Sequence, residues 1–315
     1  MNGIDEKEAL ALLESTGADM YTLFNRANLA RIAHRGTDVE LCGVINAKSG
    51  MCPENCKFCP QSIHSDSKVD CYSLVSPEKM VSAARTAGES RSARFGIVTS
   101  GESVEDEADI AAIETAVSRI DAETGVLPCA SLGLLSKETL LRLKAAGLTR
   151  YHCNLETAKS FFGNICTTHD WEDSAETIRI AKSIGLTVCS GGIFGLGESL
   201  AQRVELLAQI RELEVDSVPL NFLNPVAGTP LEDAAPISPL ECLKVVAVAR
   251  LMMPEKTIRV CGGREHNLRD LQSWLLIAGA DGLMVGGYLT TSGRQVKDDL
   301  KMIEDAGFNV IVHHD

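Results

Sequence analysis

The sequence predicts an α/β fold: a TIM-type (β/α)8 barrel preceded by an N-terminal helical extension. Three observations support this prediction. Eight strand-like segments alternate with helical segments, glycines follow several helices just before the next strand, and no linker or low-complexity segment divides the 315 residues. Strict alternation gives a parallel sheet with right-handed crossovers, and eight such units close into a barrel. An open, doubly wound sheet is the alternative fold.

The elements follow one another with clear start and stop signals. Two helices separated at Gly17 make residues 1–38 the helical extension, and residues 39–315 form a single barrel domain. Ser76 and Pro77 begin a helix as its N-cap and first-turn residue. Gly147, Gly185 and Gly279 stand where a left-handed residue ends a helix. The predicted strands are 39–46, 93–99, 126–130, 149–155, 186–190, 217–221, 257–261 and 282–285, and the helices between them include 105–120, 137–146, 175–183, 201–213 and 240–251.

Composition excludes several classes of function. The hydrophobic fraction of 45% is enough for a full core, and the net charge of −13 argues against a nucleic-acid or anionic-membrane surface, which needs clustered Lys and Arg. No apolar run has the length of a membrane span. The acidic N-terminus lacks the order of a signal peptide. We therefore expect a cytoplasmic protein.

Three of the eleven cysteines, Cys52, Cys56 and Cys59, form a C-x3-C-x2-C array in the loop after the first strand. Three thiolates on an iron–sulfur cube leave one iron open, and an open iron can chelate the amine and carboxylate of a small molecule. The alternatives are three unrelated thiols or a zinc site, although zinc usually takes four ligands.

Three more cysteines end predicted strands. Cys129, Cys189 and Cys261 end the third, fifth and seventh strands, and alternate strands of a barrel contribute side chains to one interior layer. Arg259 lies two residues before Cys261, on the same face, where its charge would favour thiolates. The alternative is that the three are simply buried. Burial is what we expect of four further cysteines, Cys42, Cys71, Cys166 and Cys242.

Polar residues and glycines also gather at strand ends. His152, Asn154 and Glu156 share one face of the fourth strand, while Cys153 points the other way. Asn221 ends the sixth strand. A glycine-rich turn at 191–198 follows the fifth strand, and its glycines would let a flat ligand approach the backbone.

Seven sequence blocks together resemble those of the biotin synthases: SGMCPENCKFCPQS, YHCNLET, FFGNICTTHDWED, TVCSGGIFGLGES, SVPLNFLNPVAGTPL, RVCGGREHN and GADGLMVGGYLTT. The cysteine loop by itself resembles that of radical S-adenosylmethionine enzymes in general. The resemblance implies a (β/α)8 barrel, usually a homodimer, that converts dethiobiotin to biotin with a 5′-deoxyadenosyl radical. It also implies a low-potential ferredoxin or flavodoxin as electron donor, and no side chain acting as acid or base.

Carried over by position, Cys52, Cys56 and Cys59 hold a [4Fe-4S] cluster whose open iron binds S-adenosylmethionine. The resemblance assigns contacts with S-adenosylmethionine to Phe58, Asn154, Glu156, Gly191, Ile193 and Gly195. It assigns contacts with dethiobiotin to His152, Asn154 and Asn221. In the family, three cysteines and an arginine hold an auxiliary [2Fe-2S] cluster, and Cys129, Cys189 and Arg259 match three of these ligands.

The chain departs from the family pattern at four positions. Gly96 stands where the remaining auxiliary cysteine would be, and Cys261 stands where Ser is usual. His152 replaces a common Asn. Ser174 replaces an Arg that binds the methionine carboxylate, and either Arg179 or His169 would have to substitute for it.

From these departures we predict an auxiliary cluster of [4Fe-4S] type held by Cys129, Cys189 and Cys261. Its open iron carries an extra sulfide, which is the sulfur inserted into dethiobiotin. Arg259 is then a weak ligand or a neighbouring charge, and Cys153 is the reserve ligand. Three alternatives remain at this point: loss of the second cluster, a hydrogenase-maturation-like enzyme acting on a small thioether or amino acid, and a non-catalytic iron–sulfur carrier or sensor.

Overall fold

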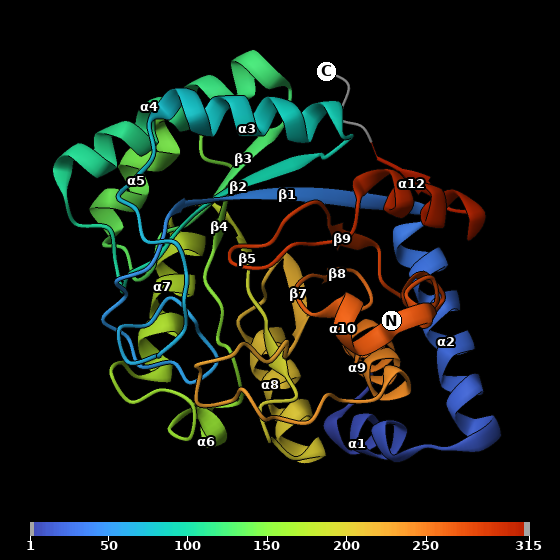
Figure 1. Ribbon diagram of the computed structural model, residues 1–315. Coiled ribbons are helices and arrows are strands. Elements are labelled where there is room, and N and C mark those ends of the chain that lie inside the picture. Colours follow the sequence, from blue (N-terminus) through green and yellow to red (C-terminus); the bar gives the residue numbers. More distant parts are fainter. Residues whose placement is uncertain (1–2, 312–315) are drawn as a thin grey trace.

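The computed structural model describes residues 3–311, in which a closed parallel sheet is surrounded by helices (Figure 1). The order of the strands is β10-β1-β2-β3-β4-β5-β7-β8-β9, and a pairing of β1 with β9 closes the ring. The short strand β6 continues β5 and pairs with β7. The predicted TIM-type (β/α)8 barrel is therefore confirmed.

The ten strands are β1 (Asp38–Lys48), β2 (Arg94–Thr99), β3 (Leu127–Ser131), β4 (Arg150–His152), β5 (Thr187–Cys189), β6 (Gly192–Phe194), β7 (Ser217–Phe222), β8 (Thr257–Val260), β9 (Gly282–Met284) and β10 (Asn309–Val310) within the described residues. The helices are α1 (Glu6–Glu14), α2 (Gly17–Arg35), α3 (Pro77–Glu89), α4 (Glu107–Thr124), α5 (Lys137–Ala145), α6 (Lys159–Phe162), α7 (Trp171–Ser183), α8 (Leu200–Glu212), α9 (Pro239–Met252), α10 (Arg264–Leu268), the 3-10 helix η1 (Arg269–Leu271), α11 (Trp274–Ile277) and α12 (Val296–Asp305).

Local signals in the sequence explain most of these boundaries. The Ser76 hydroxyl accepts a hydrogen bond from the Lys79 N–H, so it caps α3 as expected. Gly147, Gly185 and Gly279 all have positive φ, as predicted for residues that end a helix. All eight predicted barrel strands are present, with ends shifted by a few residues.

Two strand predictions were incomplete. The fourth strand was expected to reach residue 155 but β4 ends at His152, beyond which the chain forms a single bridge between Glu156 and Gly192. The 191–198 segment was expected to be a turn, yet Gly192–Phe194 forms β6 beside β7. The fifth barrel strand is thus broken at Ser190 and Gly191, and it resumes nearer the mouth of the barrel.

The register of the strands divides the barrel interior into layers. A circuit around the barrel can be traced by stepping from each residue to its paired residue on the next strand and then one residue toward the carboxyl end. This circuit passes through Cys42, Phe95, Cys129, Tyr151, Cys189, Val218, Arg259 and Leu283 and returns to Cys42. The ring closes with a rise of eight residues, which is the shear of TIM barrels. Every second member of the circuit points inward, so Cys42, Cys129, Cys189 and Arg259 belong to one interior layer, called here the thiol layer.

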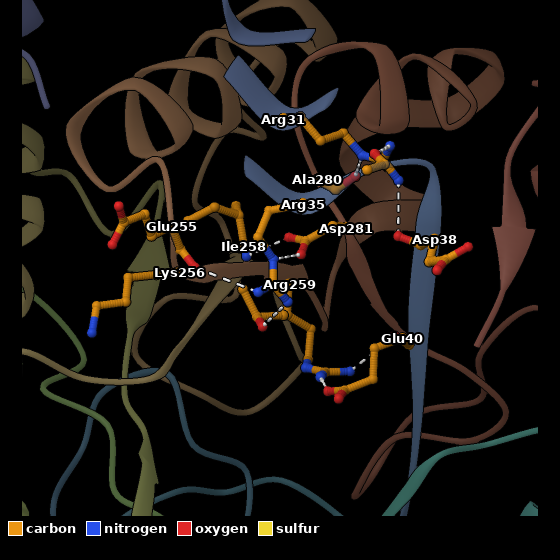
Figure 2. A network of polar contacts seen from close by, with 12 residues as sticks. Arg31, Arg35, Asp38, Glu40, Glu255, Lys256, Ile258, Arg259, Ala280 and Asp281 are labelled. Atoms are coloured by element: carbon orange, nitrogen blue, oxygen red, sulfur yellow. Dashed lines mark hydrogen bonds and ion pairs between the residues drawn. The ribbon is translucent and has the colours of Figure 1, made fainter. Parts of the chain in front are cut away.

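Helices α1 and α2 pack against α8 and α9 on the outside of the barrel (Figure 1). The guanidinium of Arg31 on α2 donates to the carbonyls of Ala280 at 2.9 Å and Asp38 at 3.1 Å, so it joins the entries of β9 and β1 (Figure 2). Arg35 forms an ion pair of 2.7 Å with Asp281. These contacts are buried or partly buried, and they attach α2 to the strand ends.

Two sequence-based expectations about composition can be compared with the structure. Leu, Ile, Val, Ala and Phe side chains between the sheet and the helices form one large buried cluster, as the hydrophobic fraction predicted. Among residues 3–311, no helix combines the length and the apolar character that crossing a membrane requires.

Candidate active site

A cavity of about 350 Å³ occupies the centre of the barrel and opens at the carboxyl ends of the strands. This is the end at which TIM barrels carry their active sites, and the volume suits a small organic ligand. Its walls contain the thiol-layer residues at depth and Asn154, Glu156 and Asn221 nearer the mouth. Phe58 and Pro60 from the cysteine loop line it as well, so the loop borders the cavity directly.

The cysteine loop is held in place by backbone hydrogen bonds. The N–H of Cys52 donates to the Gln61 carbonyl at 3.0 Å, and the N–H of Cys59 donates to the Cys56 carbonyl at 3.0 Å. The Gln61 side chain accepts from the Ser49 hydroxyl at 3.1 Å. The loop therefore has a defined shape, and its three cysteines are close in sequence to Phe58 and Pro60, which line the cavity. Three thiols without a fourth in the same loop fit a cubane cluster with one open iron.

A cluster of three side chains that sequence reasoning missed lies against this loop. Glu54, Cys166 and His169 offer a carboxylate, a thiol and an imidazole whose ligand atoms all lie within 4.8 Å of one another. Cys166 also contacts Cys56, and this hydrogen bond is the main reason that the pKa of Cys166 falls to about 5. Cys166 was expected to be simple core; it is buried, but it is also a neighbour of Cys56, a predicted cluster ligand.

The structure also assigns places to the other cysteines without a predicted role. Cys242 is fully buried on α9, as expected, but Cys71 is exposed, so the expectation of burial was wrong there. Cys42 faces the cavity rather than the hydrophobic core. Cys153 is buried on the outer side of the barrel wall and points toward the Ser174 carbonyl, which confirms that it points away from His152.

The thiol layer is surrounded by positive charge. Arg94 Nη1 lies 3.9 Å from the Cys129 sulfur, and Arg259 occupies the fourth position of the layer. Burial raises the pKa of Cys42 to about 12 although Arg259 opposes it. Burial also opposes ionisation of Cys189, but His152 and the neighbouring arginines outweigh burial and lower its pKa to about 7. Cationic neighbours are what thiolate ligands of a metal cluster require.

Beneath this layer lies a floor of charged residues. Glu40 on β1 forms ion pairs with Arg94 at 3.3 Å and with Arg150 at 3.5 Å. It also pairs with Arg259 (Figure 2). Burial would raise the pKa of Glu40, but the three guanidinium charges outweigh it and lower the pKa to about 2. Three cations and one anion leave the floor with a net positive charge.

Cys261 and His152 stand above the thiol layer. Cys261 follows β8 and lies two residues beyond Arg259, so it is one inward position nearer the mouth. His152 and Gly96 belong to the circuit one residue above the thiol layer, which lies between that layer and Cys261. The His152 side chain faces the Cys189 thiol. The three thiols predicted to meet are therefore all in the cavity, but Cys261 is higher than Cys129 and Cys189.

Polar groups near the mouth are already oriented by the backbone. Asn154 accepts from the Gly191 N–H at 3.2 Å, and Asn221 accepts from the Gly262 N–H at 3.0 Å. Glu156 adopts φ of 62°, a strained value for a residue with a side chain. Burial raises the pKa of Glu156 to about 7, partly offset by His152. The three side chains are rigid features of the cavity wall.

The glycine-rich segment contributes differently from what was expected. Ile193 lines the cavity, whereas Gly191 and Gly195 do not. A Cβ on Gly191 would lie 1.8 Å from the Pro219 carbonyl oxygen, and one on Gly192 would lie 2.4 Å from the Glu156 oxygen. These glycines therefore allow strands to pack closely, and the contacts of Gly191 and Gly195 with S-adenosylmethionine remain predictions.

The two candidates for replacing the arginine missing at Ser174 occupy different surroundings. Arg179 lies on the exposed side of α7 and pairs with Glu172 at 2.7 Å. His169 lies next to Cys166 and is hydrogen-bonded to Glu54. Of the two, only His169 is beside the cysteine loop.

The comparisons with known proteins agree with this site. A family model described as the radical SAM superfamily matches residues 48–210, and one described as the biotin and thiamin synthesis associated domain matches residues 219–309. Methylornithine synthase has the same fold, with a TM-score of 0.85 at 21% identity over 98% of this chain and 94% of that one. A hydrogenase maturase from Carboxydothermus hydrogenoformans has a TM-score of 0.86 at 18% identity, covering 99% of this chain and 77% of that one. The chain is a radical SAM enzyme, a class that implies a [4Fe-4S] cluster and S-adenosylmethionine.

The particular family follows from the curated relatives. A biotin synthase of Geotalea daltonii is 52% identical over 304 residues, which are 96% of this chain and 92% of that one. A biotin synthase of Geobacter sulfurreducens is 53% identical over 307 residues, or 98% and 93% of the two chains. This chain belongs to the biotin synthase family. The sequence-based predictions of the family and of a sulfur-inserting radical SAM enzyme are confirmed.

Proposed function

We propose that the chain inserts sulfur into dethiobiotin to form biotin, and that the reaction takes place between the cysteine loop and the thiol layer. One observation carries this proposal: the cavity bordered by the three-cysteine loop has further thiols at its base. When bound, the [4Fe-4S] cluster and S-adenosylmethionine supply the 5′-deoxyadenosyl radical that removes hydrogen from unactivated carbons of the substrate. A substrate held between the two sites would have the radical source on one side and the sulfur source on the other.

The residues of the chain have distinct roles in this proposal. Cys52, Cys56 and Cys59 hold the cluster. Phe58, Asn154, Glu156, Gly191, Ile193 and Gly195 position S-adenosylmethionine, and His152, Asn154 and Asn221 position dethiobiotin. The amides of Asn154 and Asn221 suit a neutral urea ring. Among the described residues that line the cavity near its mouth there is no group of Lys and Arg side chains that would favour a charged substrate. The enclosed barrel excludes water from the reacting carbons.

The sulfur source in this proposal is an auxiliary cluster of [4Fe-4S] type that carries an extra sulfide. Cys129 and Cys189 would hold it from the thiol layer and Cys261 from the level above, with Arg259 as a weak ligand or neighbouring charge and Cys153 outside the set. The fit is supported by the donor set, which is rich in thiols, and by the positively charged floor, which compensates the negative charge of a thiolate-bound cluster.

We further propose that residues 39–315 act as one catalytic domain with residues 1–38 as a helical extension. The protein would work as a cytoplasmic homodimer that receives electrons from a ferredoxin or flavodoxin, with neither nucleic acid nor membrane as a partner. The net charge of −13 supports the last point.

The test is anaerobic incubation of the reconstituted protein with dethiobiotin, S-adenosylmethionine and a reductant. Biotin together with 5′-deoxyadenosine is the expected result, as is rescue of a strain that cannot make biotin. If 5′-deoxyadenosine forms without biotin, the substrate assignment is wrong and a maturase-like enzyme is favoured. If neither product forms from protein that retains its iron, the chain is a carrier or sensor instead.

A further inference from the structure

The thiol layer contains one cysteine that the proposed function does not use. Cys42 is in the middle of β1, and the register places it at the same level as Cys129 and Cys189, with Arg259 completing the layer. Four inward residues from alternate strands are the standard composition of a TIM-barrel layer. Three of the four here are thiols. Cys261, by contrast, lies one inward position higher on its strand.

The surroundings of Cys42 differ from those of a structural cysteine. Structural cysteines pack among apolar side chains, as Cys242 does on α9. Cys42 lines the cavity instead, and the charges that act on it come from Arg259, Cys129, Cys189 and Glu40. Its sulfur makes only a long contact of 3.5 Å with the adjacent Gly43 carbonyl among the described residues. The thiol is thus free to bind a ligand.

Gly96 stands where the family has an auxiliary cysteine, and its position in the barrel can be related to that of Cys42. Gly96 lies on β2, the strand beside β1, and belongs to the circuit just above the thiol layer. A Cβ on Gly96 would meet a Val44 methyl group at 3.3 Å, and Gly96, Val44 and Cys42 all line the cavity. The chain lacks a thiol on β2 and has one on β1, one strand along and one level down.

We propose that Cys42 is a ligand of the auxiliary cluster, which then rests on the three thiolates of Cys42, Cys129 and Cys189. Cys261 lies one inward position above these three thiols and would contribute from the side of the cavity mouth. The charges of Arg94, Arg150 and Arg259 compensate the three thiolates from below. This inference rests on the proposed auxiliary cluster and adds to it a ligand that resemblance to the family does not supply.

The experiment isolates the auxiliary cluster by removing the other one. The full-length chain with Cys52→Ala, Cys56→Ala and Cys59→Ala serves as the background and is reconstituted anaerobically. Iron and sulfide per chain are counted, and Mössbauer and electron paramagnetic resonance spectra are recorded. We expect about four irons per chain from one [4Fe-4S]-type cluster.

Cys42→Ala is then added to the background, with Cys242→Ala as the matched control for loss of a buried cysteine. We expect Cys42→Ala to lower the iron content from about four to below about one per chain, while Cys242→Ala leaves it unchanged. Cys42→Ser preserves volume and is measured in parallel, so that a folding defect of the alanine variant is separated from loss of a ligand. A folded Cys42→Ser protein with low iron, or with a clearly altered spectrum, supports the proposal.

Two results overturn it in different ways. A background protein with four irons, whose count and spectra are unchanged by Cys42→Ser, excludes Cys42 as a ligand but leaves the proposed auxiliary cluster intact. A background protein that binds no iron at all removes the auxiliary cluster itself, and the inference about Cys42 with it.

Discussion

The carboxylate of Glu40 and the guanidinium of Arg259 form an ion pair inside the barrel (Figure 2). Glu40 precedes Cys42 by two residues on β1, so it lies one inward position below the thiol layer. Arg259 also donates to the Glu40 carbonyl at 3.2 Å, so it is fixed by both the side chain and the backbone of β1. These two contacts orient the guanidinium of Arg259 toward Glu40 and away from the mouth of the cavity.

Replacing Cys56 by alanine tests the cysteine loop. Loss of one of three cluster ligands is expected to lower 5′-deoxyadenosine formation by more than about 100-fold, since even weaker disturbances of metal sites cost 10- to 100-fold. Product is measured after anaerobic reconstitution. Cys71→Ala, a change at an exposed cysteine outside the cavity lining, is the control. Unchanged production by Cys56→Ala would rule out this loop as the radical-generating site.

Glu156 makes stability depend on pH. Its pKa is raised from 4.5 to about 7 by burial, so the folded protein holds this proton more tightly than the unfolded chain does. Stability is therefore lost as pH rises from 4.5 through 7. Glu156→Gln has no titrating carboxyl at this position, so it does not lose this stability. We therefore expect the unfolding free energy of the variant, relative to that of the natural protein, to increase by about 1–3 kcal/mol between pH 5 and pH 8.

The measurement is denaturant unfolding of reconstituted protein under anaerobic conditions at both pH values. Glu138→Gln, at an exposed position on α5, controls for a general effect of removing a carboxylate. An advantage of Glu156→Gln that is the same at pH 5 and pH 8 contradicts the raised pKa.

These residues also show how far the sequence could predict the structure. Alternating strand and helix patterns, together with glycines at helix ends, were enough for the barrel, because both signals are local. The level of each side chain was not predictable. It depends on the stagger of neighbouring strands, which arises only when the ring closes. Cys261 was grouped with Cys129 and Cys189 because all three end alternate predicted strands. It was expected one inward position above Arg259, but only the register shows that Arg259 is level with the other two thiols.

Cys42 was missed for the same reason. It lies in the middle of its strand rather than at the end, where reactive residues are normally sought, and only the register brings it level with Cys129. The Glu54, Cys166 and His169 group was equally invisible, because it joins the cysteine loop to a segment more than a hundred residues later. Resemblance to a family could assign the first cluster site, since its three proposed ligands are close together in sequence, and that assignment stays a prediction.

A thiol on β2 is expected to compensate for the loss of Cys42. Gly96→Cys would place a sulfur in the level just above the thiol layer, and the only tight approach of its Cβ is the 3.3 Å contact with Val44. We expect Gly96→Cys to restore roughly half or more of the iron lost by Cys42→Ala, because the two positions are close enough for their effects to be coupled rather than additive. Iron counting and Mössbauer spectra measure it. A double variant that stays iron-free would show that a β2 thiol cannot serve here.

The proposed homodimer has a candidate surface on α2. Tyr21, Leu29 and Ile32 are 55%, 58% and 45% exposed, which is unusual for large apolar side chains on one helix. Leu29→Asp with Ile32→Asp is expected to convert a dimer into a monomer of 33.8 kDa. Light scattering after size exclusion gives the mass. Leu141→Asp, at a similarly exposed position on α5, should leave the dimer intact, and a dimeric Leu29→Asp/Ile32→Asp protein would place the interface elsewhere.

The charged floor has a consequence for the life of the enzyme over many reaction cycles. Glu40, Arg94 and Arg150 lie below the thiol layer, and the guanidinium of Arg259 reaches from that layer down to Glu40. The cavity opens at the carboxyl ends of the strands, so the thiols are reached from the substrate side. Under the proposed chemistry each molecule of product removes one sulfur atom from the auxiliary cluster. Replacement sulfur must then enter through the same cavity mouth by which biotin leaves. Cluster repair and biotin synthesis consequently cannot occur at the same time, because the cluster can regain sulfur only after the product has left the cavity.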